Sequence, residues 1–193
     1  MEKRIPTSWQ SRPAAARTSN PNTLALPSVA SDAAALQAAA EDPAIARRMR
    51  DAYPAPYGLA NAERWIGIAP AEDPPLNFAI CTPPDHAGTT TVCGGIGLKR
   101  LADVESRTLE VGYWLGRDVW GRGIATEAPA AAAGGPVQRI EACVFGDNDA
   151  SARVLTKAGY VLEGSRRKAG FKNGKPFDIR IFGILREEVL GSR

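Results

Sequence analysis

One strand–loop–helix stretch in the middle of the chain constrains the fold more than any other feature. Apolar residues recur with a period of two over residues 109–115, which predicts a β-strand, and Glu110 lies on it. Gly121 and Gly123 follow in a loop, and the alanine-rich run 124–133 favours a helix after them. A glycine loop that opens a helix presents free backbone N–H groups and the positive end of the helix dipole, which bind phosphate. We therefore predict that this stretch holds a phosphate-bearing cofactor and that Glu110 faces the chemistry.

Composition and charge limit the class of protein. The 193 residues are 44% hydrophobic and 23% charged, which suits one soluble globular domain. A formal net charge of +3 is too small to indicate nucleic-acid binding by itself. Basic residues gather over 165–193, as either a solvated edge or a surface that attracts a nucleotide phosphate or an acidic partner. No apolar run approaches the ~20 residues that span a bilayer, and the first residues lack the apolar core of a signal peptide.

The three cysteines, Cys81, Cys93 and Cys143, are far apart in the sequence, and each falls in an apolar run. This pattern is typical of reduced core thiols in a cytoplasmic protein, and clustered ligands for a zinc site are lacking. His86 is the only histidine and lies in a proline-rich loop, so a catalytic Cys–His pair is disfavoured. The Arg- and Ser-rich first residues leave a mitochondrial transit peptide open as an alternative, although prolines interrupt any amphipathic helix there.

The predicted architecture is a mixed α+β fold. We expect a disordered extension over residues 1–21, one domain over 22–188 and a tail over 189–193. Helices are predicted over 32–40 (capped by Ser31), 43–53, 59–66 and 149–157. Strands are predicted within 22–29 (a short edge strand) and over 77–81, 89–98, 109–115, 139–145, 160–166 and 178–185. An Asn-Gly turn at 172–175 joins the last two strands, and glycines at 94, 95 and 97 predict a bulge or a close backbone approach. This order predicts a mostly antiparallel sheet with one parallel pair.

Four blocks occur in a fixed order: Glu110–Leu115 with Trp120–Ala128, then Arg139–Ala142, then Asn148–Tyr160, then Glu163–Gly164. Together they resemble the GCN5-related N-acetyltransferases (GNAT), and within that superfamily the RimJ/RimL-like ribosomal-protein N-acetyltransferases. The resemblance covers about residues 22–188. It is specific because the blocks occur together, whereas a glycine loop alone is a weak signal.

The resemblance implies a central sheet of about six to seven strands, splayed in a V, with acetyl-CoA in the opening. Residues 121–126 would turn their amides to the pyrophosphate, and the backbone of 113–115 would pair with the pantetheine. Asn148 and Ser151 would lie near the thioester sulfur. The cofactor-binding residues implied in this way are Tyr113, Trp114, Leu115, Trp120, Gly121, Arg122, Gly123, Ile124, Ala125, Thr126, Asn148 and Ser151.

The chemistry implied by the resemblance is direct attack of an amine on a thioester, which needs a base for the amine and a proton for the leaving thiolate. Glu110 is the candidate general base, acting through a water, and Ser151 the candidate donor to the thiolate. The structural alternatives are that Glu110 is a salt-bridged strand residue and that Ser151 simply occupies the first turn of a helix. Asn148 would cap that helix in either case.

Several residues depart from the pattern of the resembled superfamily. Trp120 stands where Gln or Arg is usual, although tryptophan is common in this branch, and Thr156 stands where many members place a tyrosine acid. Pro129 and the run 134–136 predict a short, interrupted helix after the glycine loop. This raises the alternatives of reduced activity or of a partner that covers the exposed sheet.

Three functions follow as hypotheses. The first is acetyl-CoA-dependent N-acetylation of a primary amine, either a protein N-terminus or a small molecule. The second is a non-catalytic acyl-CoA-binding regulatory module, and the third, less favoured, is nucleic-acid association through the basic C-terminal part. The acceptor pocket is expected between the 43–66 helices and the 166–178 loop, where Arg166, Arg167 and Lys168 would suit a carboxylate-bearing substrate. The sequence leaves both the acceptor and the choice between monomer and homodimer open.

Overall fold

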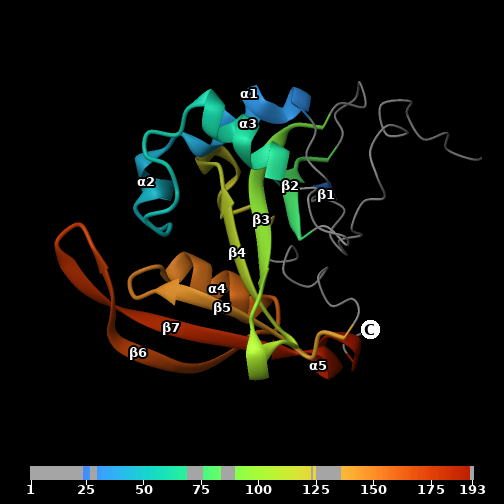
Figure 1. The fold of residues 1–193 in the computed structure, drawn as a ribbon, viewed down its shortest axis with the longest axis vertical. Coiled ribbons are helices and arrows are strands. Elements are labelled where there is room, and N and C mark those ends of the chain that lie inside the picture. The colour runs from blue at the N-terminus through green and yellow to red at the C-terminus, as the bar shows by residue number, and fades with distance from the viewer. Residues whose placement is uncertain are drawn as a thin grey trace, which may run out of the picture.

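The computed structural model describes residues 24–26, 30–68, 76–83, 90–122, 124 and 136–191. Its centre is a seven-stranded sheet in the order β1-β2-β3-β4-β5-β7-β6 (Figure 1). Every neighbouring pair is antiparallel except β4 and β5, which are parallel. The strands are β1 Leu24–Leu26, β2 Asn77–Cys81, β3 Val92–Arg100, β4 Thr108–Leu115, β5 Arg139–Phe145, β6 Val161–Lys172 and β7 Lys175–Leu185. The mixed, mostly antiparallel sheet predicted from the sequence is confirmed.

Helices flank this sheet and close two hydrophobic clusters. The helices are α1 Ala33–Ala40, α2 Pro43–Ala46, α3 Leu59–Ile68, α4 Asp149–Lys157 and α5 Arg186–Gly191, with single 3-10 turns at Ala30–Asp32, Asp103–Glu105 and Arg117–Val119. Leu36 of α1 and Ala62 of α3 are fully buried in one cluster with Ala79 of β2. Leu155 of α4 is fully buried in the other cluster, which spans β2 to β5 and β7. Both clusters support the strands that carry the site.

The parallel pair at the centre of the sheet separates into a V. β4 and β5 are paired only from Thr108 with Arg139 to Glu110 with Glu141, although both strands continue beyond these residues. In Figure 1, β4 continues upward with β2 and β3 toward α1 and α3, whereas β5, β6 and β7 run across the lower half with α4. The rest of β4, residues 111–115, therefore faces the opening, and no described strand pairs with it on this side. The splay implied by the resemblance is confirmed.

The glycines of β3 allow the neighbouring strands β2 and β4 to approach it closely. A Cβ on Gly94 would lie 2.4 Å from the Trp114 carbonyl oxygen, and one on Gly97 would lie 2.6 Å from Asn77 Oδ1. The register between β2 and β3 also shifts at Ile80 and Cys81. The close approach predicted from these glycines is confirmed.

The helix predicted over 43–53 is much shorter in the structure. α2 ends at Ala46, after Asp42 has capped it by accepting a 2.7 Å hydrogen bond from the Ala44 N–H. The segment 47–57 instead folds over β4, where the Tyr53 hydroxyl donates to the Ala40 carbonyl at 3.0 Å. Tertiary contacts therefore override the helical pattern. At α1 the prediction of a Ser31 cap is also wrong, because Asp32 is the cap residue and makes no side-chain cap bond.

The C-terminal hairpin is longer than predicted. β6 continues past Arg166 to Lys172, through an irregularity between Arg166 and Gly170 that includes Lys168 at φ 51°. This break in register hides the alternation on which the prediction relied. The turn itself has Asn173 at φ 51° and Gly174 at φ 75°. Two successive positive φ angles are the signature of a type I′ hairpin turn, so the Asn-Gly prediction is confirmed.

Some predictions fall on residues outside the described ranges. These are the extension over 1–21, the loop with His86, and the helix after the glycine loop with its interruptions at Pro129 and 134–135. The domain limits also stay predictions. Among the described helices, none combines the length and apolar content that crossing a membrane requires.

Candidate acyl-transfer site

Two adjoining cavities occupy the opening of the V. The larger, of 650 Å³, lies over β3, β4 and β5 and reaches the 48–57 segment and α3. The smaller, of 380 Å³, lies between the end of β4, the start of the glycine loop and α4. Six residues line both cavities, namely Arg48, Met49, Tyr113, Trp114, Asn148 and Ser151. Groups at this boundary can therefore contact ligands bound on either side.

A pair of hydroxyls marks the boundary. Tyr113 Oη lies 2.8 Å from Ser151 Oγ, a distance at which either hydroxyl can donate to the other. Burial raises the pKa of Tyr113 to about 12, although the hydrogen bond with Ser151 acts in the opposite direction. Tyr113 is therefore protonated at neutral pH and can act as a donor. The sequence indicated only a backbone role for this residue, but its polar tip on the apolar face of a strand was a signal for a partner.

Asn148 positions Ser151 from the start of α4. The Asn148 side chain accepts a hydrogen bond from the Ser151 N–H at 3.3 Å, which makes Asn148 the N-cap of this helix. The predicted helix, with its cap and its bounds of 149–157, is confirmed. Gly159, at φ 89°, follows the helix and provides the left-handed residue that ends it. The first turn of α4 thus holds the Ser151 hydroxyl toward β4.

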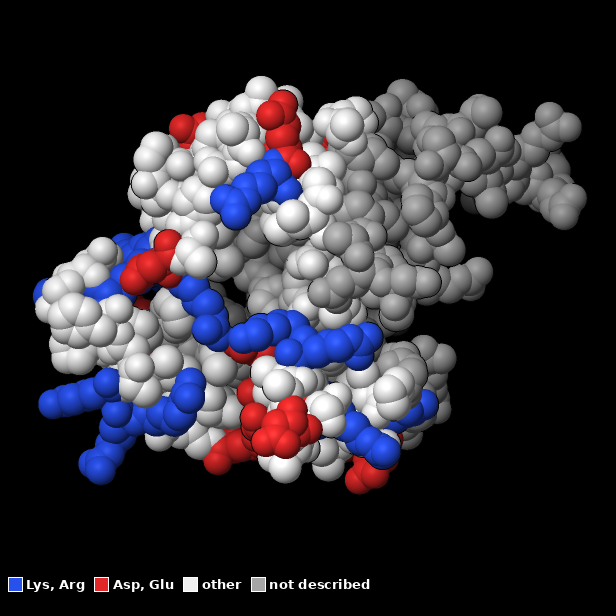
Figure 2. Space-filling view, viewed as in Figure 1, with Lys and Arg blue, Asp and Glu red and all other residues white. Residues whose placement is uncertain are grey.

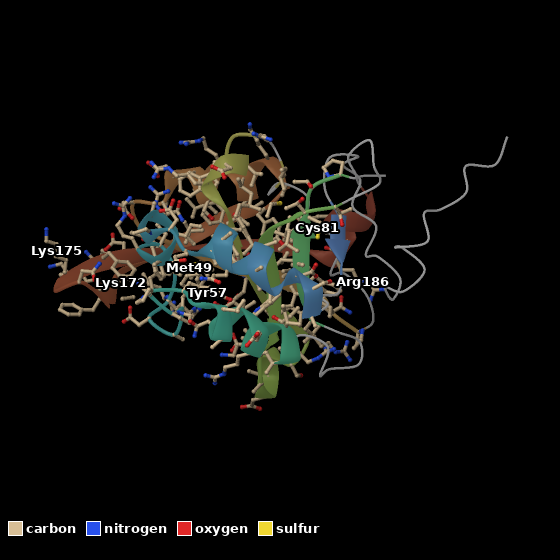
Figure 3. All side chains as sticks on the ribbon, turned by 90° about the horizontal axis from the view of Figure 1, so that it is seen from above. Met49, Tyr57, Cys81, Lys172, Lys175 and Arg186 are labelled. Atoms are coloured by element: carbon tan, nitrogen blue, oxygen red, sulfur yellow. The ribbon has the colours of Figure 1, made fainter. Side chains whose placement is uncertain are left out.

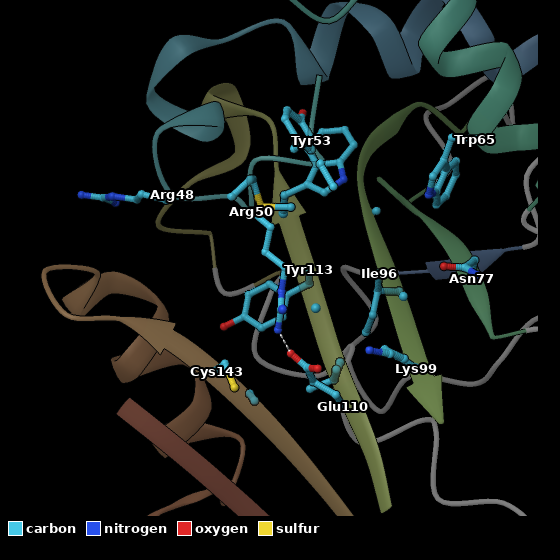
Figure 4. A pocket seen from close by; sticks show the side chains of 18 of the residues that line it. Arg48, Arg50, Tyr53, Trp65, Asn77, Ile96, Lys99, Glu110, Tyr113 and Cys143 are labelled. Atoms are coloured by element: carbon cyan, nitrogen blue, oxygen red, sulfur yellow. Dashed lines mark hydrogen bonds and ion pairs between the residues drawn. The ribbon is translucent and has the colours of Figure 1, made fainter. Parts of the chain in front are cut away.

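Glu110 lies in the larger cavity and is paired with Arg50. The Glu110 side chain is 17% exposed and its carboxylate forms an ion pair with the guanidinium of Arg50, which is 65% exposed (Figure 4). The salt-bridged alternative for Glu110 is therefore present in this structure. Arg50 comes from the segment after α2, 60 residues earlier in the chain, so no local sequence pattern indicated this pairing.

Cys143 of β5 is close to the same carboxylate. Burial raises the pKa of the Cys143 thiol, and the charge of Glu110 raises it further. The thiol is thus held protonated, which makes it a poor nucleophile. None of the three cysteines forms a disulfide, and Cys81 and Cys93 are buried.

The described part of the glycine loop lines the smaller cavity. Gly121 adopts φ 76°, in the left-handed region that glycine favours. The indole N–H of Trp120 donates to the Leu115 carbonyl at 2.8 Å and ties the loop to the end of β4. Trp120, Gly121, Ile124, Trp114 and Leu115 all line this cavity, whereas Arg122 is exposed and lines neither cavity. Gly123, Ala125 and Thr126 lie outside the described residues.

The charges of the smaller cavity suit a phosphate-bearing ligand. Arg48, Arg153 and Lys157 line it, and no acidic side chain does so among the residues that the structure describes. Arg153 and Lys157 are four residues apart on α4 and so lie on the same face of that helix. Phosphates are held by such cations together with free backbone donors. The residues present therefore fit the nucleotide half of acetyl-CoA.

The larger cavity is aromatic and basic. Tyr53, Tyr57 and Trp114 form a cluster with ring centroids 5.2–6.5 Å apart, and Trp65 lies farther along the same wall. The expectation that the 43–66 region lines an acceptor pocket matches this cavity, because ten residues between Arg48 and Trp65 line it. The expectation for 166–178 is wrong for both cavities, since none of those residues lines either one.

The hairpin acts on the larger cavity indirectly. The Lys172 ammonium donates to the Met49 carbonyl and lies 3.2 Å from a carboxylate oxygen of Asp51. Figure 3 shows Lys172 beside Met49, with Lys175 farther out at the end of the hairpin. The part of the chain that was expected to line the pocket instead holds the segment that carries Arg50.

Comparison with known proteins identifies the family. The model of the acetyltransferase (GNAT) domain matches residues 23–161, so the chain belongs to the GNAT acetyltransferase family. An uncharacterized N-acetyltransferase, YoaA, of Bacillus subtilis is 35% identical over 53% of this chain and 60% of its own length. The ribosomal-protein-serine acetyltransferase of Escherichia coli is 31% identical over 48% of this chain and 54% of its own length. The chain thus matches three fifths or less of the length of these relatives.

The fold has close counterparts among solved structures. One is the microcin C7 self-immunity acetyltransferase MccE, solved in complex with acetyl-CoA and AMP, with a TM-score of 0.71. It is 22% identical to this chain and the match covers 86% of this chain and 93% of MccE. At this identity the likeness supports the fold.

Proposed function

We propose that the protein is an acetyl-CoA-dependent N-acetyltransferase that acts on a primary amine, either a protein N-terminus or a small molecule. The observation that carries the proposal is the Tyr113–Ser151 hydroxyl pair at the boundary of the two cavities. On one side of it lies a cavity with cations for phosphate, and on the other lies a cavity with a single carboxylate, Glu110, among the described lining residues. Membership of the GNAT family supports the same donor.

Each residue then has a defined task. When bound, acetyl-CoA supplies the acetyl thioester. Glu110 accepts, through a water, the proton that the amine loses on attack. Ser151 holds a proton at Oγ for the departing thiolate, and the Tyr113 hydroxyl orients Ser151. The free backbone edge of β4, over residues 113–115, is the site for the pantetheine amides, and Trp120 to Thr126, with Asn148, complete the cofactor side. Cysteines that form no disulfide suit a reducing compartment, so a cytoplasmic location is part of this proposal.

The test compares turnover with binding in wild type and one double variant. Purified protein with acetyl-CoA and a panel of primary amines is expected to release CoA and to form acetylated products visible by mass spectrometry. Glu110→Gln with Ser151→Ala should lower kcat by roughly 100-fold or more, because both proton transfers are impaired. The Kd for acetyl-CoA, measured by calorimetry, should change little. Wild-type protein that binds acetyl-CoA but acetylates no amine would instead be a binding module.

A further inference from the structure

The larger cavity has an unbalanced set of charges. Among its described lining residues, Glu110 is the only acidic side chain. Four basic side chains line the same cavity, and they are Arg48, Arg50, Arg64 and Lys99. Lys99 of β3 is also the cross-strand partner of Glu110. Figure 2 shows Lys and Arg side chains in a band between the upper and lower halves of this face. A purely cationic acceptor would therefore be repelled, except at one carboxylate.

That carboxylate already has a partner from across the cavity. Arg50 reaches Glu110 with its guanidinium, while most of its side chain stays in solvent (Figure 4). An ion pair with one mostly exposed member contributes little to stability, so a ligand can replace it. An amine that reaches Glu110 must displace Arg50. The displaced guanidinium then lies beside the bound amine with no counter-charge.

We propose that the acceptor carries an anionic group close to its amine. Such an acceptor separates the Arg50–Glu110 pair and gives each of the two residues a new partner of opposite charge. The acceptor amino group, with the water that links it to Glu110, takes the place of the guanidinium, and the acceptor anion, a carboxylate, binds the released Arg50. Lys99 and Arg64 extend the positive wall for that anion, and Tyr53 and Trp114 contact the carbon skeleton. The substrate class is an α-amino acid or a peptide with an acidic residue at its N-terminal end. This inference rests on the proposed acetyltransferase activity.

The experiment measures kcat/KM for acceptors that differ only in charge. The probes are C-terminally amidated tripeptides Ser-Glu-Ala, Ser-Gln-Ala and Ser-Lys-Ala, together with free serine and serinamide. Wild type should favour Ser-Glu-Ala over Ser-Gln-Ala by roughly tenfold, the effect of one charge-assisted hydrogen bond. If wild type prefers free serine over serinamide, the anion is the α-carboxylate of an amino acid. If it prefers only Ser-Glu-Ala over Ser-Gln-Ala, the anion is an acidic side chain near a peptide N-terminus. The inference is overturned if wild type prefers neither Ser-Glu-Ala over Ser-Gln-Ala nor free serine over serinamide.

Variants of Arg50 test whether its guanidinium is the group that binds the acceptor anion. Arg50→Ala should lower kcat/KM for Ser-Glu-Ala roughly tenfold and leave the value for Ser-Gln-Ala unchanged or higher, because Glu110 is no longer occupied. Arg50→Lys keeps the charge and should keep the preference. Arg47→Ala is the matched control, since Arg47 is on the same segment and lines neither cavity. A preference unchanged in Arg50→Ala overturns the inference alone. The proposed function is overturned only if wild type transfers acetyl neither to these probes nor to any member of the primary-amine panel.

Discussion

Tyr113 presents a half-buried hydroxyl from β4, 2.8 Å from Ser151 Oγ. The ring packs against the main hydrophobic cluster, so Tyr113→Phe removes the hydroxyl and keeps the packing. We expect this variant to lower kcat by about tenfold, because Ser151 loses the partner that orients it, with little change in the Kd for acetyl-CoA. Steady-state kinetics at neutral pH, together with a calorimetric Kd, is the measurement.

Tyr160 provides the control for the Tyr113→Phe variant. Its ring is also buried, its hydroxyl has no hydrogen-bond partner among the described residues, and burial raises its pKa. Tyr160→Phe should therefore leave kcat unchanged. An equal loss of kcat in both variants would mean that general packing, and not the Tyr113 hydroxyl, supports turnover.

At the scale of elements, the pairing of β3 with β4 depends on glycine at one position. A Cβ at Gly94 would lie 2.4 Å from the Trp114 carbonyl oxygen, which is backbone and cannot turn away. Gly94→Ala should lower the free energy of unfolding by roughly 1–3 kcal/mol, and each kcal/mol should lower the Tm by about 2–4 °C. Gly112→Ala is the matched control in the neighbouring strand, because its Cβ would meet no atom within 4 Å. Equal Tm values for the two variants in thermal unfolding would contradict this role of the close approach.

The sequence predicted the elements where local signals were strong. The bounds of β2, β5 and α4 match the predictions, because alternation defines the strands and Asn148 and Gly159 punctuate the helix. The prediction of a helix over 43–53 failed because residues outside that segment, Lys172 and Ala40, form hydrogen bonds with it that hold it in another conformation. The site followed the same rule. Glu110, Asn148 and Ser151 belong to recognisable blocks, whereas the pairing of Arg50 with Glu110 depends on how distant segments meet in the folded chain.

At the scale of the whole molecule, the C-terminal hairpin contacts a segment that lines the larger cavity, although the hairpin itself does not line it. Lys172 contacts the Met49 carbonyl and the Asp51 carboxylate, and these two residues flank Arg50 in the chain. The hairpin lines neither cavity, so its effect on the acceptor passes through the 49–51 segment. Arg50 lines only the larger cavity, whereas Met49 lines both. A change at Lys172 should therefore alter acceptor binding more than cofactor binding.

Lys172→Ala tests this coupling. Loss of one charged hydrogen bond and one ion pair should release the 49–51 segment, so that KM for the acceptor rises by roughly threefold to tenfold. The Kd for acetyl-CoA should change less than the KM for the acceptor, and amide hydrogen exchange should quicken over residues 47–53. Lys175→Ala, at the exposed end of the same hairpin, should change none of these quantities. If Lys172→Ala weakens acetyl-CoA binding as much as acceptor binding, the hairpin supports the whole cleft, and the two cavities are not independent.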